Sequence, residues 1–228
     1  MNADLSRNHP EEFQRLKKML EYEHQAYHDG YQRIAGIDEV GRGPIAGPVV
    51  AAAVILPRDF CLAGVNDSKL LSEKKRLELA KIIKLEALAW SVAAISSRRI
   101  DEINILQATL EAMCLAVHEL MPQPDYLLVD AVKIPGLSIC QCPIIKGDTL
   151  SVSIACASIL AKVERDQIMQ NYDGIYAGYG FATHKGYGTR GHHSALHHLG
   201  PCPIHRGSFA PVRSMLSNEG CAEPSLFD

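Results

Sequence analysis

The sequence predicts a single α/β domain built around a mixed β-sheet. Its apolar content of 47% and charged content of 21% are ordinary for a globular protein. Short runs of β-branched residues and alanine, bounded by glycine or proline, indicate buried strands. Two strands come first and helices then interrupt the series of strands, an order that indicates an α/β fold with a mixed sheet.

The first half of the chain contains three of the predicted strands. Tyr31–Asp38 and Val49–Leu56 suit two buried strands joined by the short glycine loop 40–48. The charged segment Glu73–Glu86 is a predicted helix, and the third strand, Ala89–Ile95, follows it.

Two more strands are predicted in the second half. The helical stretch Asp101–Leu120 ends before Pro122, because proline disrupts a helix interior. The apolar run Tyr126–Val129 has the character of a central strand, so Asp130 lies at a strand end. Ile139–Ile145 is expected to form a further strand.

Helices and loops complete the domain. After a turn at Lys146–Asp148, a helix is predicted for Ser151–Asn171. Residues 174–191 are rich in glycine, tyrosine and histidine, which we interpret as an active loop region. A helix at His193–Leu199 belongs to a small C-terminal helical part.

The two ends differ from the body of the chain. Residues 11–28 have apolar side chains at helical spacing among charges, so residues 1–30 are predicted to form a helical extension outside the main body. The main domain then spans 31–213. Residues 214–228 are polar and lose the periodicity, which predicts a flexible tail.

Several protein classes are excluded by composition. The first 23 residues contain no apolar segment with a cleavage site, so we expect no signal peptide and a cytoplasmic location. The longest apolar run, Pro44–Pro57, is shorter than the ~20 residues of a membrane helix, and no membrane association is expected. Seven cysteines in such a chain are expected to be thiols.

Four acidic residues lie at strand ends or in a turn, where the functional sites of α/β proteins are usually found. Asp38 and Glu39 end the first apolar strand, Asp130 follows another, and Asp148 lies in a turn before a helix. Successive strand side chains face opposite sides, so the first strand must end or twist for Asp38 and Glu39 to reach one site. Alone, Asp38–Glu39 could be a solvated pair and Asp148 a helix-capping acid. Together they predict a site for Mg²⁺ or Mn²⁺, which prefer oxygen ligands.

The glycine loop also matches a dinucleotide-binding pattern. Gly41-Arg-Gly43-Pro-Ile-Ala46 fits G-x-G-x-x-A after a strand. That pattern needs a helix to begin at the loop, whereas Gly47–Pro48 and a strand follow here, so this interpretation is rejected. The glycines more simply allow the backbone to approach a ligand, with Arg42 adding a phosphate or base contact.

Taken together, these segments resemble a known family. The relevant stretches are Ile34-Ala-Gly-Ile-Asp38-Glu39-Val-Gly-Arg-Gly-Pro-Ile-Ala-Gly-Pro48, Asp67-Ser-Lys69, Val129-Asp130, Lys146-Gly-Asp148, Ala157-Ser-Ile-Leu-Ala-Lys162 and His184-Lys-Gly-Tyr187-Gly-Thr189. In order, spacing and content they resemble bacterial ribonuclease HII, a type 2 ribonuclease H, over residues 31–213. One departure is Gly207, which replaces the second arginine of a family His-Arg-Arg-Ser-Phe pattern and puts a phosphate contact there in doubt.

The resemblance implies a fold and a chemistry. The fold would be ribonuclease H-like, with a mixed central sheet flanked by helices and a small C-terminal helical part. The activity would be hydrolysis of the RNA strand of RNA–DNA hybrids and cutting 5′ of ribonucleotides embedded in duplex DNA, leaving 5′-phosphate and 3′-hydroxyl ends. By the same resemblance two Mg²⁺ or Mn²⁺ ions take part: Asp38 bridges both, Glu39 and Asp130 hold one, and Asp148 holds the other.

The resemblance also implies how substrate is bound. The backbone of Gly41, Arg42 and Gly43 would read the 2′-hydroxyl that distinguishes RNA from DNA. Tyr187 would pack on the sugar of the neighbouring deoxynucleotide, although it could simply be a half-buried loop aromatic. Further substrate-binding candidates, including basic side chains for phosphate, are Lys69, Ser151, Lys162 and Arg165, the last three sharing one helix face.

Three other functions compete with this interpretation. The first is a zinc site among His192, His193, His197, His198, Cys202 and His205, which lacks a Cys-x₂-Cys pair. The second is a noncatalytic RNA–DNA binding module, which would need a damaged metal site. The third is another metal nuclease of the same fold, such as a resolvase, which should lack the Gly-Arg-Gly and Tyr187 elements.

The tail and the assembly state remain separate expectations. The residues Glu223-Pro-Ser-Leu226-Phe227 resemble the Gln-Leu-Ser-Leu-Phe type of peptide by which bacterial DNA enzymes dock on the sliding clamp. Only Ser225, Leu226 and Phe227 agree with it, so a frayed end with two chance hydrophobic residues is the competing explanation. A monomer is expected.

Overall fold

The computed structural model describes residues 9–218, which form two compact units. Unit 1 comprises the chain up to Val40, Val50–Ala94 and Thr109–Glu164. Unit 2 comprises Gly41–Val49, Ile95–Ala108 and the chain from Arg165 onward. The expected domain 31–213 is therefore divided between two units.

Unit 1 is built on a five-stranded sheet with the order β3-β2-β1-β4-β5. Strand β1 pairs antiparallel with β2 and parallel with β4, and β4 pairs parallel with β5, so the predicted mixed sheet is confirmed. The strands are β1 (Ile34–Val40), β2 (Val49–Ile55), β3 (Ala89–Ile95), β4 (Tyr126–Asp130) and β5 (Cys140–Ile144).

The burial of each strand follows from its place in the sheet. Every residue of β2 is buried, as its continuous run of valine, alanine and isoleucine predicts for a strand covered on both faces. Strand β3 lies at the edge of the sheet and alternates buried and more exposed residues. Strand β1 begins later than expected, because the N–H groups of Gln32 and Arg33 donate to the Asp125 carboxylate.

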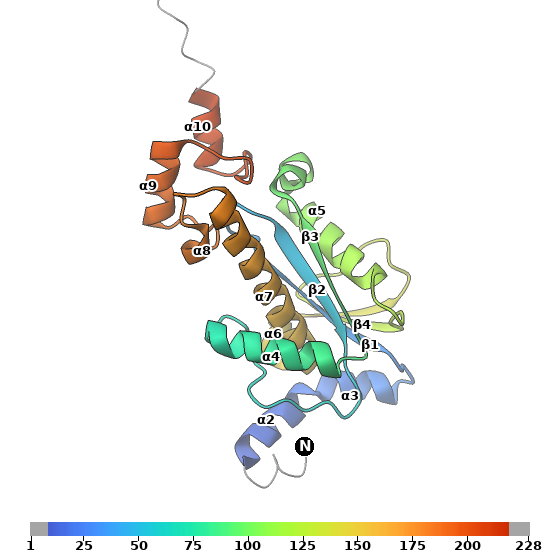
Figure 1. The fold of residues 1–228 in the computed structure, drawn as a ribbon. Helices are drawn as coiled ribbons and strands as arrows, with labels where there is room; N and C mark the ends of the chain where they lie inside the picture. The colour runs from blue at the N-terminus through green and yellow to red at the C-terminus, as the bar shows by residue number, and fades with distance from the viewer. Residues whose placement is uncertain (1–8, 219–228) are drawn as a thin grey trace, which may run out of the picture. The chain divides into compact units, whose positions relative to one another are not determined.

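Helices cover both faces of this sheet (Figure 1). Helix α5 lies on the face to which Ser91 of β3 points, where the Ser91 hydroxyl donates to the Ala116 carbonyl. Helix α4 lies on the other face, where Lys84 stacks over the Trp90 ring at 4.4 Å. None of the helices in residues 9–218 is long and apolar enough to cross a membrane. The helices that contribute to unit 1 are α2 (Pro10–Met19), α3 (Glu21–His28), α4 (Glu73–Glu86), α5 (Ser97–His118), α6 (Gly147–Leu150) and α7 (Val152–Ile175).

Helix α5 begins four residues before its predicted start and is interrupted once. Asn104 has a φ of 68°, outside the helical region. Its side-chain oxygen accepts hydrogen bonds from the N–H groups of Leu106 and Gln107, as the cap of a new helix does. The remainder of α5 therefore begins afresh after Asn104.

The N-terminal helices α2 and α3 are part of unit 1. Leu16, Met19 and Ala26 are buried, and the carboxylate of Glu23 accepts a hydrogen bond from the Ser151 hydroxyl at 2.6 Å. The prediction that this segment lies outside the main body is therefore wrong. The sequence showed the narrow apolar stripe of this segment, but not that the stripe packs on the sheet side of the unit.

Helix α7 lies unusually close to β1. A Cβ atom placed on Gly36 would lie 2.1 Å from the carbonyl carbon of Ser153 and 2.5 Å from the Ile154 nitrogen. No side chain fits in that space, so glycine at position 36 allows the helix backbone to rest directly on the strand that carries Asp38.

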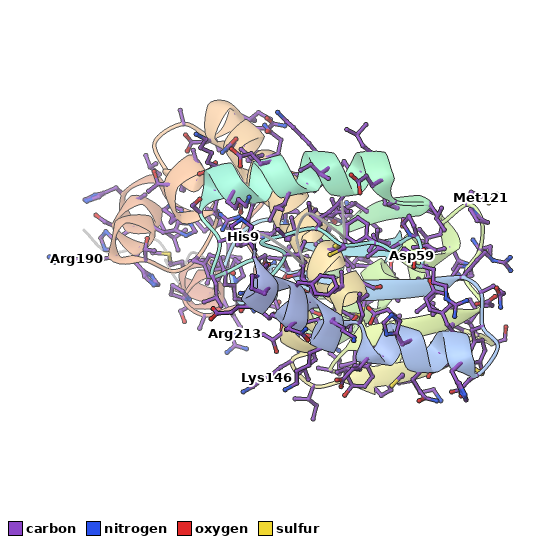
Figure 2. All side chains as sticks on the ribbon, turned by 90° about the horizontal axis from the view of Figure 1, so that it is seen from below. His9, Asp59, Met121, Lys146, Arg190 and Arg213 are labelled. Atoms are coloured by element: carbon purple, nitrogen blue, oxygen red, sulfur yellow. The ribbon has the colours of Figure 1, made fainter. Side chains whose placement is uncertain are left out.

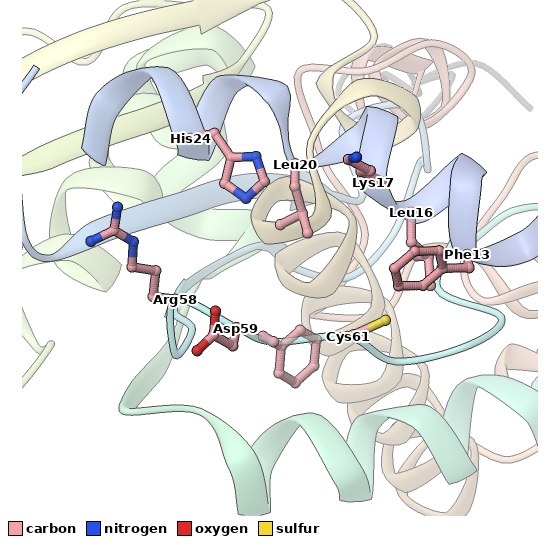
Figure 3. Close-up of a pocket in the computed structure, with 9 residues that line it drawn as sticks. Phe13, Leu16, Lys17, Leu20, His24, Arg58, Asp59 and Cys61 are labelled. Atoms are coloured by element: carbon pink, nitrogen blue, oxygen red, sulfur yellow. The ribbon is translucent and has the colours of Figure 1, made fainter. Parts of the chain in front are cut away.

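A cavity of about 190 Å³ lies between the N-terminal helices and the segment after β2 (Figure 3). Figure 3 shows Leu20 and His24 directed from these helices toward the segment that carries Asp59 and Cys61. None of the residues predicted to form the functional site lines this cavity.

Unit 2 contains the helices after α7 and two small hydrophobic clusters. One cluster is centred on Phe181 with Ala46 and Met169, and the other joins Ile45 to Leu196 and Val212. The helices are α8 (Phe181–His184), α9 (Arg190–Leu199) and α10 (Val212–Asn218).

Two predicted boundaries in unit 2 change. Helix α9 begins before His193, because the Thr189 hydroxyl accepts a hydrogen bond from the His192 N–H and caps the helix there. Helix α10 continues to Asn218, so residues 214–218 of the expected flexible tail are helical. Residues 219–228 lie outside the described part of the chain.

Candidate active site

Three of the predicted acids meet at the adjacent ends of β1 and β4. Carboxylate oxygens of Asp38, Glu39 and Asp130 all lie within 4.8 Å of one another. The parallel ladder explains the meeting, because Ile37 pairs with Val129 and the next residue of each strand is an aspartate. Adjacent parallel strands end at the same edge of the sheet.

The sequence required β1 either to end at Asp38 or to twist there, and the strand does not end at Asp38. It continues to Val40, with Asp38 opposite Ala52 and Glu39 opposite Ala51. Asp38 is nearly buried, and its carboxylate accepts a hydrogen bond from the Glu39 N–H at 2.7 Å. The side chain of Asp38 thus bends toward the end of the strand, where Glu39 also reaches the group.

Asp148 lies beside this group rather than within it. It is 8% exposed on the short helix α6 and lies 4.0 Å from the Lys69 ammonium group. Its charge is close enough to interact with Asp130 and with Asp67. The structure therefore brings all four predicted acids into one region of unit 1.

A backbone contact fixes Asp130 to the turn that carries Asp148. The Gly147 N–H donates to the Asp130 carboxylate at 2.7 Å. A Cβ atom at Gly147 would lie 2.5 Å from the Ile154 side chain and 3.3 Å from that carboxylate, so a larger residue would require the Ile154 side chain to move. Lys146 precedes it with a φ of 58° and points its side chain outward (Figure 2).

Burial and mutual repulsion control the charge of the acids. Burial, followed by the charge of Glu39, raises the pKa of Asp38 well above its usual value, and a hydrogen bond with Ser158 only partly opposes this. Burial raises the pKa of Asp130, and the Gly147 N–H opposes it. Burial, Asp67 and Asp130 raise the pKa of Asp148. The acids are therefore costly to ionise together unless a cation is present.

This group fits a divalent metal ion. Among residues 9–218, the three acids are the one set of potential metal ligands found close enough to share an ion. Its donors are all carboxylate oxygens, which suit hard ions such as Mg²⁺ and Mn²⁺. A bound cation would also relieve the repulsion that raises the pKa of Asp38.

The sequence did not predict a pair of buried serines that is hydrogen-bonded to Asp38. The hydroxyls of Ser68 and Ser158 lie 2.9 Å apart, both residues are buried, and Ser158 also hydrogen bonds to Asp38. Asp67 was noted only as a neighbour of Lys69, yet its carboxylate accepts from the Lys69 N–H at 2.9 Å. The Asp67-Ser-Lys69 stretch was the available signal, and only its lysine was interpreted.

The other substrate-binding candidates of unit 1 differ in exposure. The Lys69 side chain is 78% exposed; partial burial would lower its pKa, but the carboxylates of Asp67 and Asp148 outweigh burial and raise it. Lys162 is half-buried. Ser151 is fully buried and hydrogen-bonded to Glu23, which corrects the expectation that it binds substrate.

In unit 2, two buried arginines hold the glycine loop through its carbonyl groups. The Arg206 guanidinium donates to the carbonyls of Gly41, Arg42 and Gly47. The Arg165 guanidinium donates to the carbonyls of Pro48, Ala46 and Lys185.

Both arginines are fully buried. Burial, and then the charge of Arg165, lowers the pKa of Arg206 to about 9. The expected phosphate contact of Arg165 is therefore corrected: its three guanidinium nitrogens shape the loop from inside unit 2. Arg206 is a structural residue that the sequence analysis mentioned only within a motif.

The conformation of the glycine loop depends on the hydrogen bonds from Arg165 and Arg206. Gly41 has a φ of 95°, and a Cβ atom there would lie 2.2 Å from the Arg165 Nε. Arg42 and Gly43 are exposed, so one edge of the loop faces solvent while its carbonyls are bound from behind.

Tyr187 lies beside the exposed edge of the glycine loop. Its ring is 43% exposed, and a Cβ atom on Gly43 would lie 3.9 Å from it. The Arg165 guanidinium carbon lies 5.9 Å from the ring centroid. The structure therefore brings Tyr187 and the Gly41–Gly43 segment together in unit 2, as the sequence predicted.

At Gly207, where the family pattern has an arginine, the backbone makes hydrogen bonds instead. The N–H groups of Gly207 and Ser208 donate to the Asp101 carboxylate at 2.7 and 2.9 Å. Asp101 thus binds this turn in the absence of a side chain at position 207.

The histidines of unit 2 do not form a metal site. His192 is fully buried, and its Nε2 lies 3.0 Å from the Nε2 of His205, so the two rings bond to each other. Burial lowers the pKa of His192 to about 4 and also lowers the pKa of His205. The His192 ring meets the Phe181 ring edge-on, and the His205 ring is tilted against it.

A mixed sheet with clustered carboxylates at the ends of its central strands defines a nuclease that depends on divalent metal ions. The comparisons make this specific. A model of the family described as "Ribonuclease HII" matches residues 35–212. The chain belongs to the ribonuclease HII family of RNA–DNA hybrid endoribonucleases.

Relatives by sequence and by fold agree with this membership. A ribonuclease HII of Syntrophomonas wolfei is 56% identical over 96% of this chain and 86% of its own length. One of Listeria monocytogenes is 54% identical over 87% of this chain and 76% of its own length. The ribonuclease H2 of Pyrococcus horikoshii has the same fold, with a TM-score of 0.68 and 24% identity over 82% of this chain and 98% of that one.

The substitution Asp38→Asn is expected to stabilise the metal-free protein at alkaline pH. The folded state raises the pKa of Asp38, so the stability from this carboxyl is present at low pH and is lost as the pH rises through that pKa. Asparagine keeps an acceptor for the Glu39 N–H and has no charge to repel. We expect the Tm in EDTA at pH 8 to rise by roughly 2–6 °C.

Differential scanning calorimetry at pH 5 and pH 8 measures this effect. The gain should be smaller at pH 5, and Asp29→Asn, at an exposed position, should change the Tm little at either pH. A lower Tm for Asp38→Asn than for the parent at pH 8 would contradict the account of repulsion.

Proposed function

We propose that this hybrid endonuclease also cuts DNA duplexes 5′ of single embedded ribonucleotides, using two divalent metal ions. The observation that carries the proposal is the group formed by Asp38, Glu39 and Asp130, with Asp148 beside it. Recognition of a ribonucleotide also requires a surface that contacts its sugar. The exposed edge of the glycine loop and Tyr187 supply this surface.

The four acids would hold the metal ions, Mg²⁺ or Mn²⁺. When bound, such ions activate the attacking water and stabilise charge on the leaving oxygen of the scissile phosphodiester. The chain's own part is positioning: Gly147 orients Asp130 through its N–H, and Ser158 orients Asp38. By family resemblance Asp38 would serve as a ligand of both ions, Glu39 and Asp130 would hold one, and Asp148 would hold the other.

Selection for RNA would rest on the glycine loop. A 2′-hydroxyl both donates and accepts hydrogen bonds, so fixed peptide groups can recognise it. Arg206 holds the carbonyls of Gly41 and Arg42, which fixes the peptide planes of this segment. Tyr187 would pack its exposed ring on the sugar of the adjoining deoxynucleotide.

Phosphate groups would meet basic side chains of both units. Lys69, close to Asp148, and Lys162 remain the candidates in unit 1, and Arg42 is the exposed candidate in the glycine loop. Such contacts position the duplex without reading its sequence.

The competing functions lack support from particular residues. A noncatalytic hybrid-binding module would need a damaged acid group, and all four acids are present. A resolvase-like nuclease would have no use for the Gly-Arg-Gly loop beside Tyr187. The remaining expectations are a monomer that acts in the cytoplasm during DNA replication and repair.

Asp130→Asn is expected to abolish cleavage and spare duplex binding. The substitution removes a metal ligand and leaves the basic side chains in place, so the cleavage rate should fall by more than about a hundredfold. The assay combines purified protein, Mg²⁺ and a DNA duplex with one ribonucleotide, and maps the ends of the products. An all-DNA duplex and Asp29→Asn serve as controls.

Two results would count against the proposed function. One is cleavage of the ribonucleotide duplex by Asp130→Asn within tenfold of the parent at saturating Mg²⁺. The other is cleavage by the parent at positions other than 5′ of the ribonucleotide, which would reject the junction specificity while leaving hybrid cleavage intact.

Tyr187→Ala is expected to reduce junction cutting more than duplex affinity. Packing of the Tyr187 ring on a sugar would bury apolar surface worth about 1.5–3 kcal/mol, so cutting should fall about tenfold or more. Tyr187→Phe keeps the ring and should cut nearly as the parent does. Binding measured by fluorescence anisotropy in Ca²⁺ separates the two effects, and an equal fall in affinity and cutting would make Tyr187 a binding residue only.

The tail motif suggests a partner for the enzyme. A ribonuclease HII of Archaeoglobus fulgidus, 27% identical over 78% of this chain and 95% of that one with a TM-score of 0.64, has been solved as a "PCNA:RNase HII complex". We propose that Leu226 and Phe227, outside the described residues, anchor this chain to a sliding clamp in a weak contact.

A labelled peptide of residues 217–228 titrated with the bacterial clamp tests this contact. Saturable binding that disappears after Leu226→Ala with Phe227→Ala would support it. Absence of saturation by about 1 mM, or equal binding by the doubly substituted peptide, would reject it.

A further inference from the structure

Glu23 is a buried carboxyl group that neither the metal site nor the substrate surface explains. It lies on α3 and is 3% exposed. One of its oxygens, Oε1, accepts hydrogen bonds from the Ser151 hydroxyl at 2.6 Å and from the Ser153 N–H at 2.9 Å. The other, Oε2, is buried and has no hydrogen-bond partner among residues 9–218.

Packing alone gives no reason for a carboxyl group there. Helix α3 is already fixed to the sheet by apolar contacts of Ala26 with the cluster of Ile34, Leu128 and Ile154. Burying a carboxyl group with one unsatisfied oxygen opposes folding. Residues that oppose folding in this way are expected where function requires them.

The partner of Glu23 connects two helices. Ser151 lies between α6 and α7, and its N–H donates to the Gly147 carbonyl at 2.8 Å. Its hydroxyl oxygen accepts from the Ile154 N–H at 3.2 Å, so it also caps α7. Glu23 accepts hydrogen bonds from the Ser151 hydroxyl and from the Ser153 N–H, and it thereby fixes the junction of the two helices.

Helix α6 contacts β4, β5 and α2, and hydrogen bonds fix both of its ends. It is four residues long, and a helix of this length is unstable in isolation. Its first residue, Gly147, is bound to Asp130, and its end is fixed by Ser151 and Glu23. Asp148 lies between these two anchors.

We infer that Glu23 is a positioning residue for the metal site: through Ser151 it holds α6 so that Asp148 faces the other three acids. This inference rests on the proposed role of Asp148 as a metal ligand. It gives the N-terminal helices a function in the active site, although none of their side chains belongs to it.

Glu23→Ala is expected to weaken metal binding about tenfold, the smaller effect seen when a hydrogen-bond partner of a metal ligand is lost. The turnover number kcat should fall with it, and the KM for a hybrid substrate should change little, because no phosphate contact is altered. Glu23→Gln keeps the acceptor oxygen and should bind metal as the parent does. Ser151→Ala should reproduce the loss.

Metal binding is measured by calorimetric titration of Mn²⁺ alone into the full-length, metal-free protein, well below its unfolding temperature. Glu21→Ala removes an exposed carboxyl from the same helix and should have no effect. Val117→Ala removes a buried side chain from α5 and should lower the Tm without altering Ser151 or α6, so it should leave the Mn²⁺ affinity unchanged.

The outcomes separate this inference from the proposed function. If the parent binds no Mn²⁺, the metal site itself is rejected and the role of Glu23 with it. If the parent binds Mn²⁺ and Glu23→Ala binds it equally well, only the positioning role is rejected. An equal loss in Val117→Ala, or a loss in Glu23→Gln as large as in Glu23→Ala, would also overturn it, because loss of stability or of charge would then be the cause.

Discussion

The parallel pairing of β1 with β4 determines where the chemistry of this protein can occur. Ile37 pairs with Val129, so Asp38 and Asp130 lie side by side, each directly after an apolar run of its strand. The sheet supplies rigidity and burial, and burial raises the pKa of Asp38. The clustered carboxylates repel one another when ionised, and a divalent cation would stabilise their charges.

In unit 2, positively charged side chains fix the conformation of the glycine loop. A glycine-rich loop has little conformational preference of its own, because glycine loses more entropy than other residues when it is fixed. Arg165 and Arg206 supply the missing restraint by donating to five carbonyls within loop 41–48 and to that of Lys185. Guanidinium groups suit this role, since each offers several donors in one plane and stays charged when buried.

The sequence predicted the sheet and the acids well because both depend on local patterns. Every predicted strand is present, since apolar runs bounded by glycine and proline mark strands without knowledge of their partners. Asp38 and Asp130 were found because an acid after an apolar run is conspicuous. Arg165 and Ser151 were misjudged because a polar residue on a helix gives no local sign of whether it faces solvent or distant carbonyl groups. The packing of α2 and α3 escaped prediction for the same reason: it depends on contacts with residues far along the chain, such as those of Ala26 with Leu128 and Ile154.

Gly36 has a consequence for how this protein can change over time. With the Ser153 carbonyl carbon 2.1 Å from the place of a Cβ atom, the smallest possible side chain would push α7 away from β1. That helix carries Ser158 to the strand's Asp38, so a shift of one methyl group's width would reach the acid through its hydroxyl partner. The spacing between β1 and α7 is thus encoded by the absence of a side chain, and single substitutions offer no gradual route by which this spacing could change.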